Sequence, residues 1–125
     1  MRLLLDTQIA LWLMRDAVEL GVAARQTIQA ADEVFVSSVS IWEVTIKAGL
    51  GKLPVDPSRF ESQLLLAGVQ PLPVTWTHAI TLRDLPALHR DPFDRMLVAQ
   101  ALSEPLHLLT HDATLKPYSE LVIVV

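Results

Sequence analysis

Two acidic residues directly follow apolar runs of the chain. Asp6 ends the run Leu3–Leu5, and Asp112 comes just after the run Leu106–Thr110. Such runs are typical of buried strands, and ligands of open α/β sheets bind at the carboxyl ends of the strands. For each acid taken alone, a helix cap or a local turn is the alternative explanation.

A third acid, Asp94, stands at the start of an amphipathic helix. Apolar residues follow it at distances of 3, 4, 7 and 8 positions, so Asp94 heads the face that turns toward the core. An acid in a first turn is favoured by the helix dipole, but Asp91 already supplies a cap there. A second acid that points toward the core needs a partner, because burying an unpaired carboxylate costs several kcal/mol.

Glu43 is the fourth acid at an unusual position. It shares a helix face with Val39, Ile46 and Leu50, so its carboxylate borders an apolar stripe. Two structural explanations compete with a functional one. Ser40 and Glu43 have the spacing of a capping box, and Glu43 could pair with Lys47 one turn later.

The four acids together predict a metal site. In a parallel sheet, strand ends and the following helix starts share one edge, so these carboxylates can converge there. Two carboxylates about 4 Å apart repel by about 4 kcal/mol at an effective dielectric of 20, which a cation or protons must offset. Ligation by carboxylates alone, with no histidine or thiol, favours Mg²⁺ or Mn²⁺, and the matching chemistry is metal-assisted phosphodiester hydrolysis.

The elements that must position these acids alternate along the chain. Short β-like runs are separated by helical patterns, which predicts an α/β fold with a mainly parallel sheet of four to five strands. The predicted strands are Arg2–Asp6, Glu33–Ser37, Leu106–Thr110 and Leu121–Val125, with Leu72–Val74 as a weaker fifth. The predicted helices are Thr7–Met14, Glu19–Ala31, one from Ser40 to Gly49, Pro57–Ala67, Thr75–Leu85 and one from Pro92 to about Glu104.

Length and composition narrow the class of protein. The chain has 125 residues, 51% of them hydrophobic, which predicts one globular domain spanning residues 1–125. It has no cysteine, so disulfides and cysteine metal sites are excluded. No apolar run approaches the ~18 residues of a membrane span, and we expect a cytoplasmic protein without a membrane partner.

Other side chains give weaker indications. The four histidines lack the spacing of a zinc site, and the three tryptophans lie in helical patterns with apolar neighbours, which predicts core packing. Basic residues flank the acids in sequence and are candidates for holding phosphates. These are Lys47, Lys52, Arg90 and Arg95.

Four blocks of the sequence, in order, resemble the PIN-domain ribonucleases, specifically the VapC-like toxins of toxin–antitoxin modules. The blocks are LLLDTQIALW, SSVSIWEVTIKAGLGKL, HRDPFDRMLVAQA and LLTHDATL, and the resemblance covers essentially the whole chain. It places the family's acids on Asp6, Glu43, Asp94 and Asp112. It also implies that Thr110 is a polar residue supporting these ligands. The third block begins with two aspartates, and we take Asp94 as the ligand and Asp91 as a cap or support.

The resemblance implies more than a site. It implies a three-layer α/β/α sandwich and a Mg²⁺- or Mn²⁺-dependent endoribonuclease that cleaves structured RNA such as tRNA. It further implies a homodimer that is inhibited by a cognate antitoxin, whose apolar helix lies in a groove and reaches toward the site.

The resulting hypothesis has Asp6 and Asp94 holding the principal metal. Glu43 and Asp112 complete the pocket directly or through water, and Glu43 helps to orient or deprotonate the attacking water. One alternative is a phosphatase with an aspartate nucleophile, but Thr7 and Gln8 follow Asp6 where a second acid is needed. The other alternative is a PIN-like module that only binds a partner.

The formal net charge of −4 fits this hypothesis better than its sign suggests. A protein that binds nucleic acid through a general positive field is usually basic. Here the four site acids account for −4, and the 10 remaining acids balance the 10 bases. The sequence therefore predicts RNA binding that needs the metal and local bases.

Overall fold

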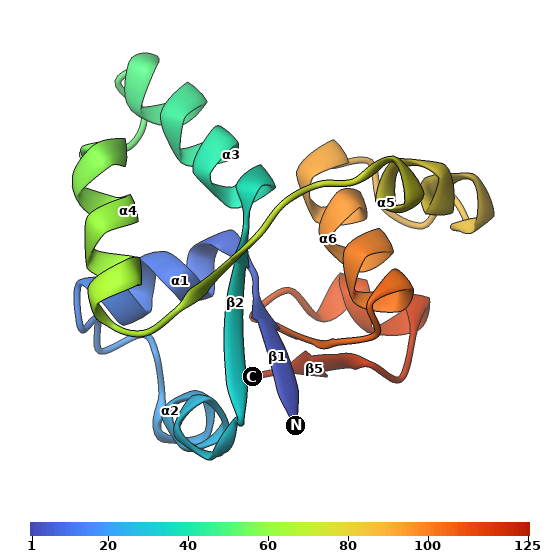
Figure 1. Ribbon diagram of the computed structural model, residues 1–125, viewed down its shortest axis with the longest axis horizontal. Coiled ribbons are helices and arrows are strands. Elements are labelled where there is room, and N and C mark those ends of the chain that lie inside the picture. The colour runs from blue at the N-terminus through green and yellow to red at the C-terminus, as the bar shows by residue number, and fades with distance from the viewer.

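The computed structural model covers residues 1–125 and consists of strands and helices that alternate along most of the chain (Figure 1). None of its helices combines the length and the apolar character needed to cross a membrane. In chain order the elements are β1 (Arg2–Leu5), α1 (Thr7–Met14), α2 (Val22–Ala30), β2 (Glu33–Ser37), α3 (Ser38–Gly49), α4 (Pro57–Leu66), β3 (Gln70–Leu72), α5 (Trp76–Thr81), η1 (Leu82–Asp84), α6 (Pro92–Ser103), β4 (His107–Thr110), η2 (Ala113–Tyr118) and β5 (Val122–Val124).

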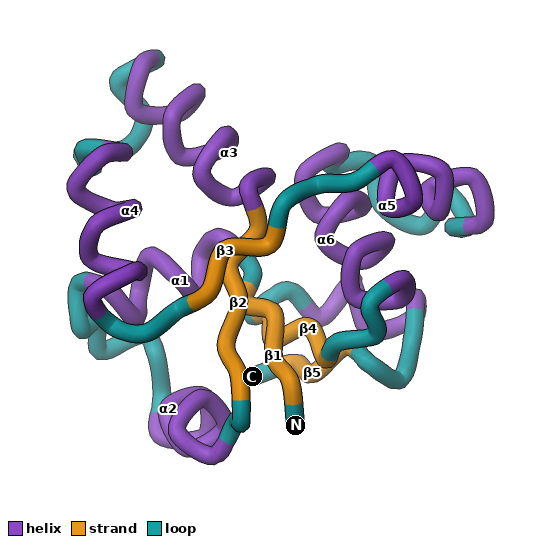
Figure 2. The backbone as a smooth tube through the Cα atoms, in the orientation of Figure 1, coloured by secondary structure: helices purple, strands orange, loops and turns teal.

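The five strands form one parallel sheet in the order β3-β2-β1-β4-β5 (Figure 2). From the central strand β1 the chain first adds β2 and β3 on one side. It then returns to add β4 and β5 on the other side. The predicted parallel α/β sheet is confirmed, although β3 spans Gln70–Leu72 instead of Leu72–Val74. Pro71 is tolerated because β3 is an edge strand.

Alternating side chains of β1 build the two halves of the core. Leu3 and Leu5 pack on one face with residues of α1, α2, α3 and α4. Leu4 points to the other face and packs mainly with residues of α6. Figure 1 shows α1, α2 and α4 on one side of the sheet and α5 and α6 on the other. A strand covered on both faces must be apolar throughout, which explains the run Leu3–Leu5 and gives the predicted three layers.

The start of α3 differs from the prediction. The helix begins at Ser38, directly after β2, and the hydroxyl of Ser37 caps it by accepting the backbone N–H of Val39 at 3.0 Å. Ser40 therefore lies inside the helix, fully buried, where its hydroxyl accepts the hydroxyl of Thr7 at 2.9 Å. The predicted capping box of Ser40 and Glu43 is wrong, because no loop separates this strand from its helix.

Core packing was also the wrong prediction for two of the tryptophans. Trp42 on α3 is 61% exposed and Trp76 on α5 is 89% exposed. Trp12 on α1 is partly buried and contacts the ring of His111 edge-on, with 5.1 Å between ring centroids. Apolar neighbours along a helix do not show which way a side chain points. Trp42 instead contributes to an apolar surface beside the site described next.

Candidate active site

A pocket of about 460 Å³ lies where the strand order reverses. After β1 the chain continues to β2 on one side of it, and it later returns to form β4 on the other side. The helices that follow β1 and β4 therefore diverge from each other at the carboxyl ends of these two strands. Such switch points are the usual ligand sites of open α/β sheets. Six charged side chains line this pocket: Asp6, Glu43, Lys47, Asp91, Asp94 and Asp112. The structure thus brings the four predicted acids together and adds Asp91 to them.

Asp6 is the most deeply buried of the four predicted acids. It links β1 to α1, and its carboxylate caps α1 by accepting the backbone N–H of Ile9 at 2.8 Å. Its second oxygen accepts the hydroxyl of Thr110, which stands at the end of β4. Burial raises the pKa of Asp6 above its ordinary value, although the bonds from Thr110 and Ile9 oppose the shift. The capping explanation is therefore correct, but capping leaves the carboxylate on the pocket wall.

Asp94 differs from the other acids of the pocket because its carboxylate has no hydrogen-bond donor. It lies in the first turn of α6, whose cap is Asp91, and no hydrogen bond reaches its carboxylate. Burial raises the pKa of Asp94 to about 7, and repulsion by Asp91 and Asp6 contributes to the rise. A carboxylate that is buried beside other acids without a hydrogen bond is suited to bind a cation.

Glu43 reaches the pocket from α3 and is paired within its own helix. Its carboxylate accepts a hydrogen bond from Lys47 Nζ at 2.7 Å, and this bond raises the pKa of Lys47. The predicted apolar stripe beside Glu43 is only partly correct. Val39 is buried, but Ile46 is 37% and Leu50 is 64% exposed. The buried face of α3 instead carries Val39, Ser40, Glu43 and Val44.

Asp112 lies at the rim and is held more firmly by the protein than the other acids. It caps η2, and its Oδ1 accepts the backbone N–H of Thr114 at 2.9 Å and its hydroxyl at 2.6 Å. These bonds lower the pKa of Asp112. Thr110 accepts the backbone N–H of Asp112 at 3.0 Å. Through its two hydrogen bonds, Thr110 couples Asp112 to Asp6.

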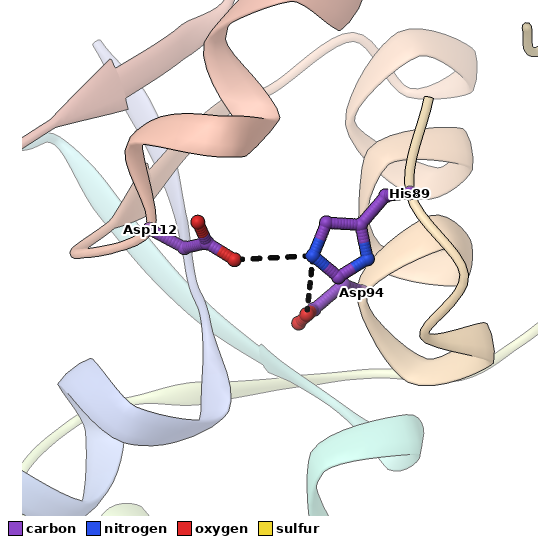
Figure 3. A group of neighbouring side chains, drawn as sticks. All are labelled: His89, Asp94 and Asp112. Atoms are coloured by element: carbon purple, nitrogen blue, oxygen red, sulfur yellow. Dashed lines mark hydrogen bonds and ion pairs between the residues drawn. The ribbon is translucent and has the colours of Figure 1, made fainter. Parts of the chain in front are cut away.

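One residue of the site escaped the sequence analysis. His89 lies before α6, and its Nε2 is 3.2 Å from Asp112 Oδ2 and 3.8 Å from Asp94 Oδ2 (Figure 3). Ligand atoms of these three residues all lie within 4.8 Å of one another. The only available signal was its position two residues before the cap of α6, which does not distinguish it from an ordinary loop histidine.

The candidate phosphate-binding bases are distributed unevenly. Lys47 lines the pocket, whereas Lys52, Arg90 and Arg95 do not. Arg95 donates to the carbonyl of Pro86 at 3.3 Å and so braces the loop before α6. Contacts of these three residues with RNA remain predictions.

The donor set fits a hard divalent cation. The pocket offers carboxylate oxygens from Asp6, Glu43, Asp94 and Asp112, and no thiol. The two acids whose pKa values burial raises, Asp6 and Asp94, are those that gain most from a nearby positive charge.

The family model described as PIN domain matches residues 3–121, which include every acid of the pocket. The chain belongs to the PIN-domain family. Ribonuclease VapC22 of Mycobacterium tuberculosis is 31% identical to this PIN-domain chain over 117 residues, covering 92% of the chain and 90% of the relative.

Solved structures give the same fold. The crystal structure of VapBC2 from Rickettsia felis, bound to a DNA fragment from their promoter, contains a chain with a TM-score of 0.70 and 15% identity, covering 100% of this chain and 98% of that one. A chain of FitAcB from Neisseria gonorrhoeae has a TM-score of 0.67 and 14% identity, covering 98% and 96%. A toxin–antitoxin complex from Klebsiella pneumoniae contains a chain with a TM-score of 0.66 and 18% identity, covering 97% and 95%.

Proposed function

We propose that this PIN-domain protein is a Mg²⁺- or Mn²⁺-dependent endoribonuclease that acts as the toxin of a toxin–antitoxin module. The observation that carries the proposal is the convergence of five carboxylates at the switch point of the sheet. The similarity to Ribonuclease VapC22 supports RNA as the substrate. The raised pKa of Asp94 supports the metal requirement, because Lys47, the one lysine or arginine that lines the pocket, is paired with Glu43 and not with Asp94.

In the proposed mechanism Asp6 and Asp94 hold the principal cation, and Glu43 and Asp112 complete the pocket directly or through water. When bound, the cation supplies positive charge beside the scissile phosphate and acidifies the attacking water. Thr110 fixes the carboxylate of Asp6 by its hydrogen bond. Glu43 orients or deprotonates the water, and its partner Lys47 offers a positive charge to the phosphate.

RNA-end sequencing after brief induction tests this function most directly. Wild type should produce new 5′ ends at defined positions in a cellular RNA, for which tRNA is the first candidate, and Asp94→Asn should produce none. The purified protein should cleave the same RNA only with Mg²⁺ or Mn²⁺. Cleavage that persists in excess EDTA, or in Asp94→Asn at the wild-type rate, would refute the proposal.

An antitoxin partner is supported by a second, apolar pocket of about 440 Å³. It lies between α3 and α4 and is lined by side chains that include Ile41, Trp42, Leu64 and Leu65. Trp42 is adjacent to Glu43, so α3 separates this surface from the acidic pocket. An apolar antitoxin helix seated here would be placed to reach the active site. If a small open reading frame lies immediately upstream of the gene, co-expression of its product should restore growth to cells that express the wild-type protein but not to cells that express Trp42→Ala.

The remaining proposals concern the form in which the protein works. We propose that residues 1–125 act as one domain, that two copies form a homodimer, and that the protein works in the cytoplasm, where its RNA substrates occur. Light scattering coupled to gel filtration measures the oligomeric state. A mass near 27.8 kDa, twice the 13.9 kDa of the chain, is expected.

A further inference from the structure

His89 is held in one orientation by contacts at three of its atoms. Its backbone N–H donates to the hydroxyl of Tyr118 at 2.9 Å, and its Nδ1 accepts the backbone N–H of Asp91 at 3.1 Å. Its Nε2 faces the carboxylate of Asp112 at 3.2 Å, as Figure 3 shows. The side chain is only 20% exposed. So complete a set of contacts is unusual for a loop residue whose role is only to connect two helices.

These contacts define which ring nitrogen carries the proton. Because Nδ1 accepts the N–H of Asp91, Nε2 carries the hydrogen and acts as the donor. The acceptor of that hydrogen is Asp112 Oδ2 at 3.2 Å, and Asp94 Oδ2 lies 3.8 Å from the same nitrogen. Neither ring nitrogen therefore offers a free lone pair to a cation.

The same residue ties together both ends of η2. Asp112 caps the start of η2 and accepts a hydrogen bond from Nε2 of His89. Tyr118 is the last residue of η2, and its hydroxyl accepts a hydrogen bond from the backbone N–H of His89. On its other side, Asp112 is fixed through Oδ1 by Thr114. The orientation of the Asp112 carboxylate is thus set from two directions, and His89 supplies one of them.

We propose that His89 is a positioning residue, which holds Asp112 beside Asp94 by donating from Nε2 and does not itself bind the metal. The proposal rests on the metal-dependent function proposed above. It differs from a site in which His89, Asp94 and Asp112 ligate together. Ligation through Nε2 would require its proton to move to Nδ1, which would cost both the hydrogen bond to Asp112 and the bond that Nδ1 accepts from Asp91.

Mn²⁺ titration followed by electron paramagnetic resonance tests the positioning role without using activity. His89→Phe keeps a ring but removes the donor, and we expect a 10- to 100-fold weaker Mn²⁺ affinity, the usual effect of losing a residue that orients a ligand. His89→Gln restores an N–H near the position of Nε2 and should lie within about threefold of wild type. His107→Phe on β4, outside the pocket, is the matched control and should bind Mn²⁺ as wild type does.

Pulsed resonance on Mn²⁺-loaded wild type then separates positioning from ligation. The expected spectrum shows no directly coordinated nitrogen; a nitrogen coupling that disappears in His89→Phe would overturn the proposal. It is equally overturned if His89→Phe, folded by circular dichroism, binds Mn²⁺ as tightly as wild type, or if His89→Gln is as impaired as His89→Phe. Failure of the wild type to bind Mn²⁺ and cleave RNA would instead remove the proposed function, and this inference with it.

Discussion

Asp94→Asn should make the metal-free protein more stable while abolishing cleavage. Asparagine has nearly the same shape as aspartate but carries no charge, and no hydrogen bond to the Asp94 carboxylate is lost. In wild type, burial and the neighbouring Asp91 and Asp6 raise the pKa of Asp94 from 3.8 to about 7. Ionising Asp94 therefore costs more free energy in the folded pocket than in the unfolded chain.

The size of the effect follows from the pKa shift. A shift of about 3 units corresponds to about 4 kcal/mol at a pH above the folded pKa, which is a ceiling. The side chain is 24% exposed, so solvent screening and relaxation reduce the value, and we expect about 1–3 kcal/mol. Between about pH 4 and pH 7 the folded state binds more protons at Asp94 than the unfolded state does. The stability of wild type therefore falls relative to that of Asp94→Asn as the pH rises through this window, and the difference is constant above it.

Urea unfolding at a series of pH values, in EDTA, measures the difference. The exposed acid Asp84 provides a matched control, since Asp84→Asn should change the free energy of unfolding by less than about 0.5 kcal/mol. Mg²⁺ at 1,000 times its Kd should reverse the order, because it stabilises wild type by about 4.1 kcal/mol. A metal-free Asp94→Asn protein less stable than wild type at about pH 8, or a stability difference independent of pH, would refute the electrostatic reasoning.

Three further predictions follow from the same geometry. Mn²⁺ affinity should rise from about pH 6 to pH 8 with release of a proton from Asp94, measurable by calorimetry in buffers of different ionisation enthalpy. Thr110→Val should cost about 1–3 kcal/mol in urea unfolding and weaken Mn²⁺ binding, because it removes the hydroxyl bonded to Asp6; unchanged binding would contradict the role of Thr110. Lys47→Met, with all metal ligands intact and Ca²⁺ in place of Mg²⁺ to limit cleavage, should weaken RNA binding and reduce its salt slope by about 0.7–1, measured by filter binding, whereas an unchanged slope would exclude a phosphate contact.

The parts of the site that could be predicted from sequence are those fixed by the backbone. Asp6 and Asp112 follow strands, and parallel strands necessarily bring their carboxyl ends to one edge. The position of Asp94 could be predicted from helical periodicity, because its place on the core face of α6 depends only on the spacing of the apolar residues that follow it. The order of the strands, and hence the switch point between β1 and β4, is not contained in these local patterns.

The parts that were wrong or missed depend on tertiary contacts. Ser40 has the spacing of a cap, but β2 runs directly into α3, so Ser37 takes that role and Ser40 is buried against Thr7. Trp42 has apolar neighbours, but it lies at the open edge of α3, where it contacts Phe93 edge-on and stays 61% exposed. His89 belongs to the site only because η2 brings Asp112 and Tyr118 to it, and these residues come 23 and 29 positions later in the chain.

The geometry also changes the meaning of the net charge. Five of the 14 acids and one of the 10 bases line the pocket, so nine acids and nine bases remain elsewhere. The whole formal charge of −4 is therefore confined to one pocket, and the rest of the surface is balanced. In the proposed function, the net repulsion of a polyanionic RNA is concentrated where its scissile phosphate would enter, and a divalent cation bound there would remove half of the formal charge. The proposed dependence of catalysis on the cation thus follows from where the charge lies, since the rest of the chain carries no net charge.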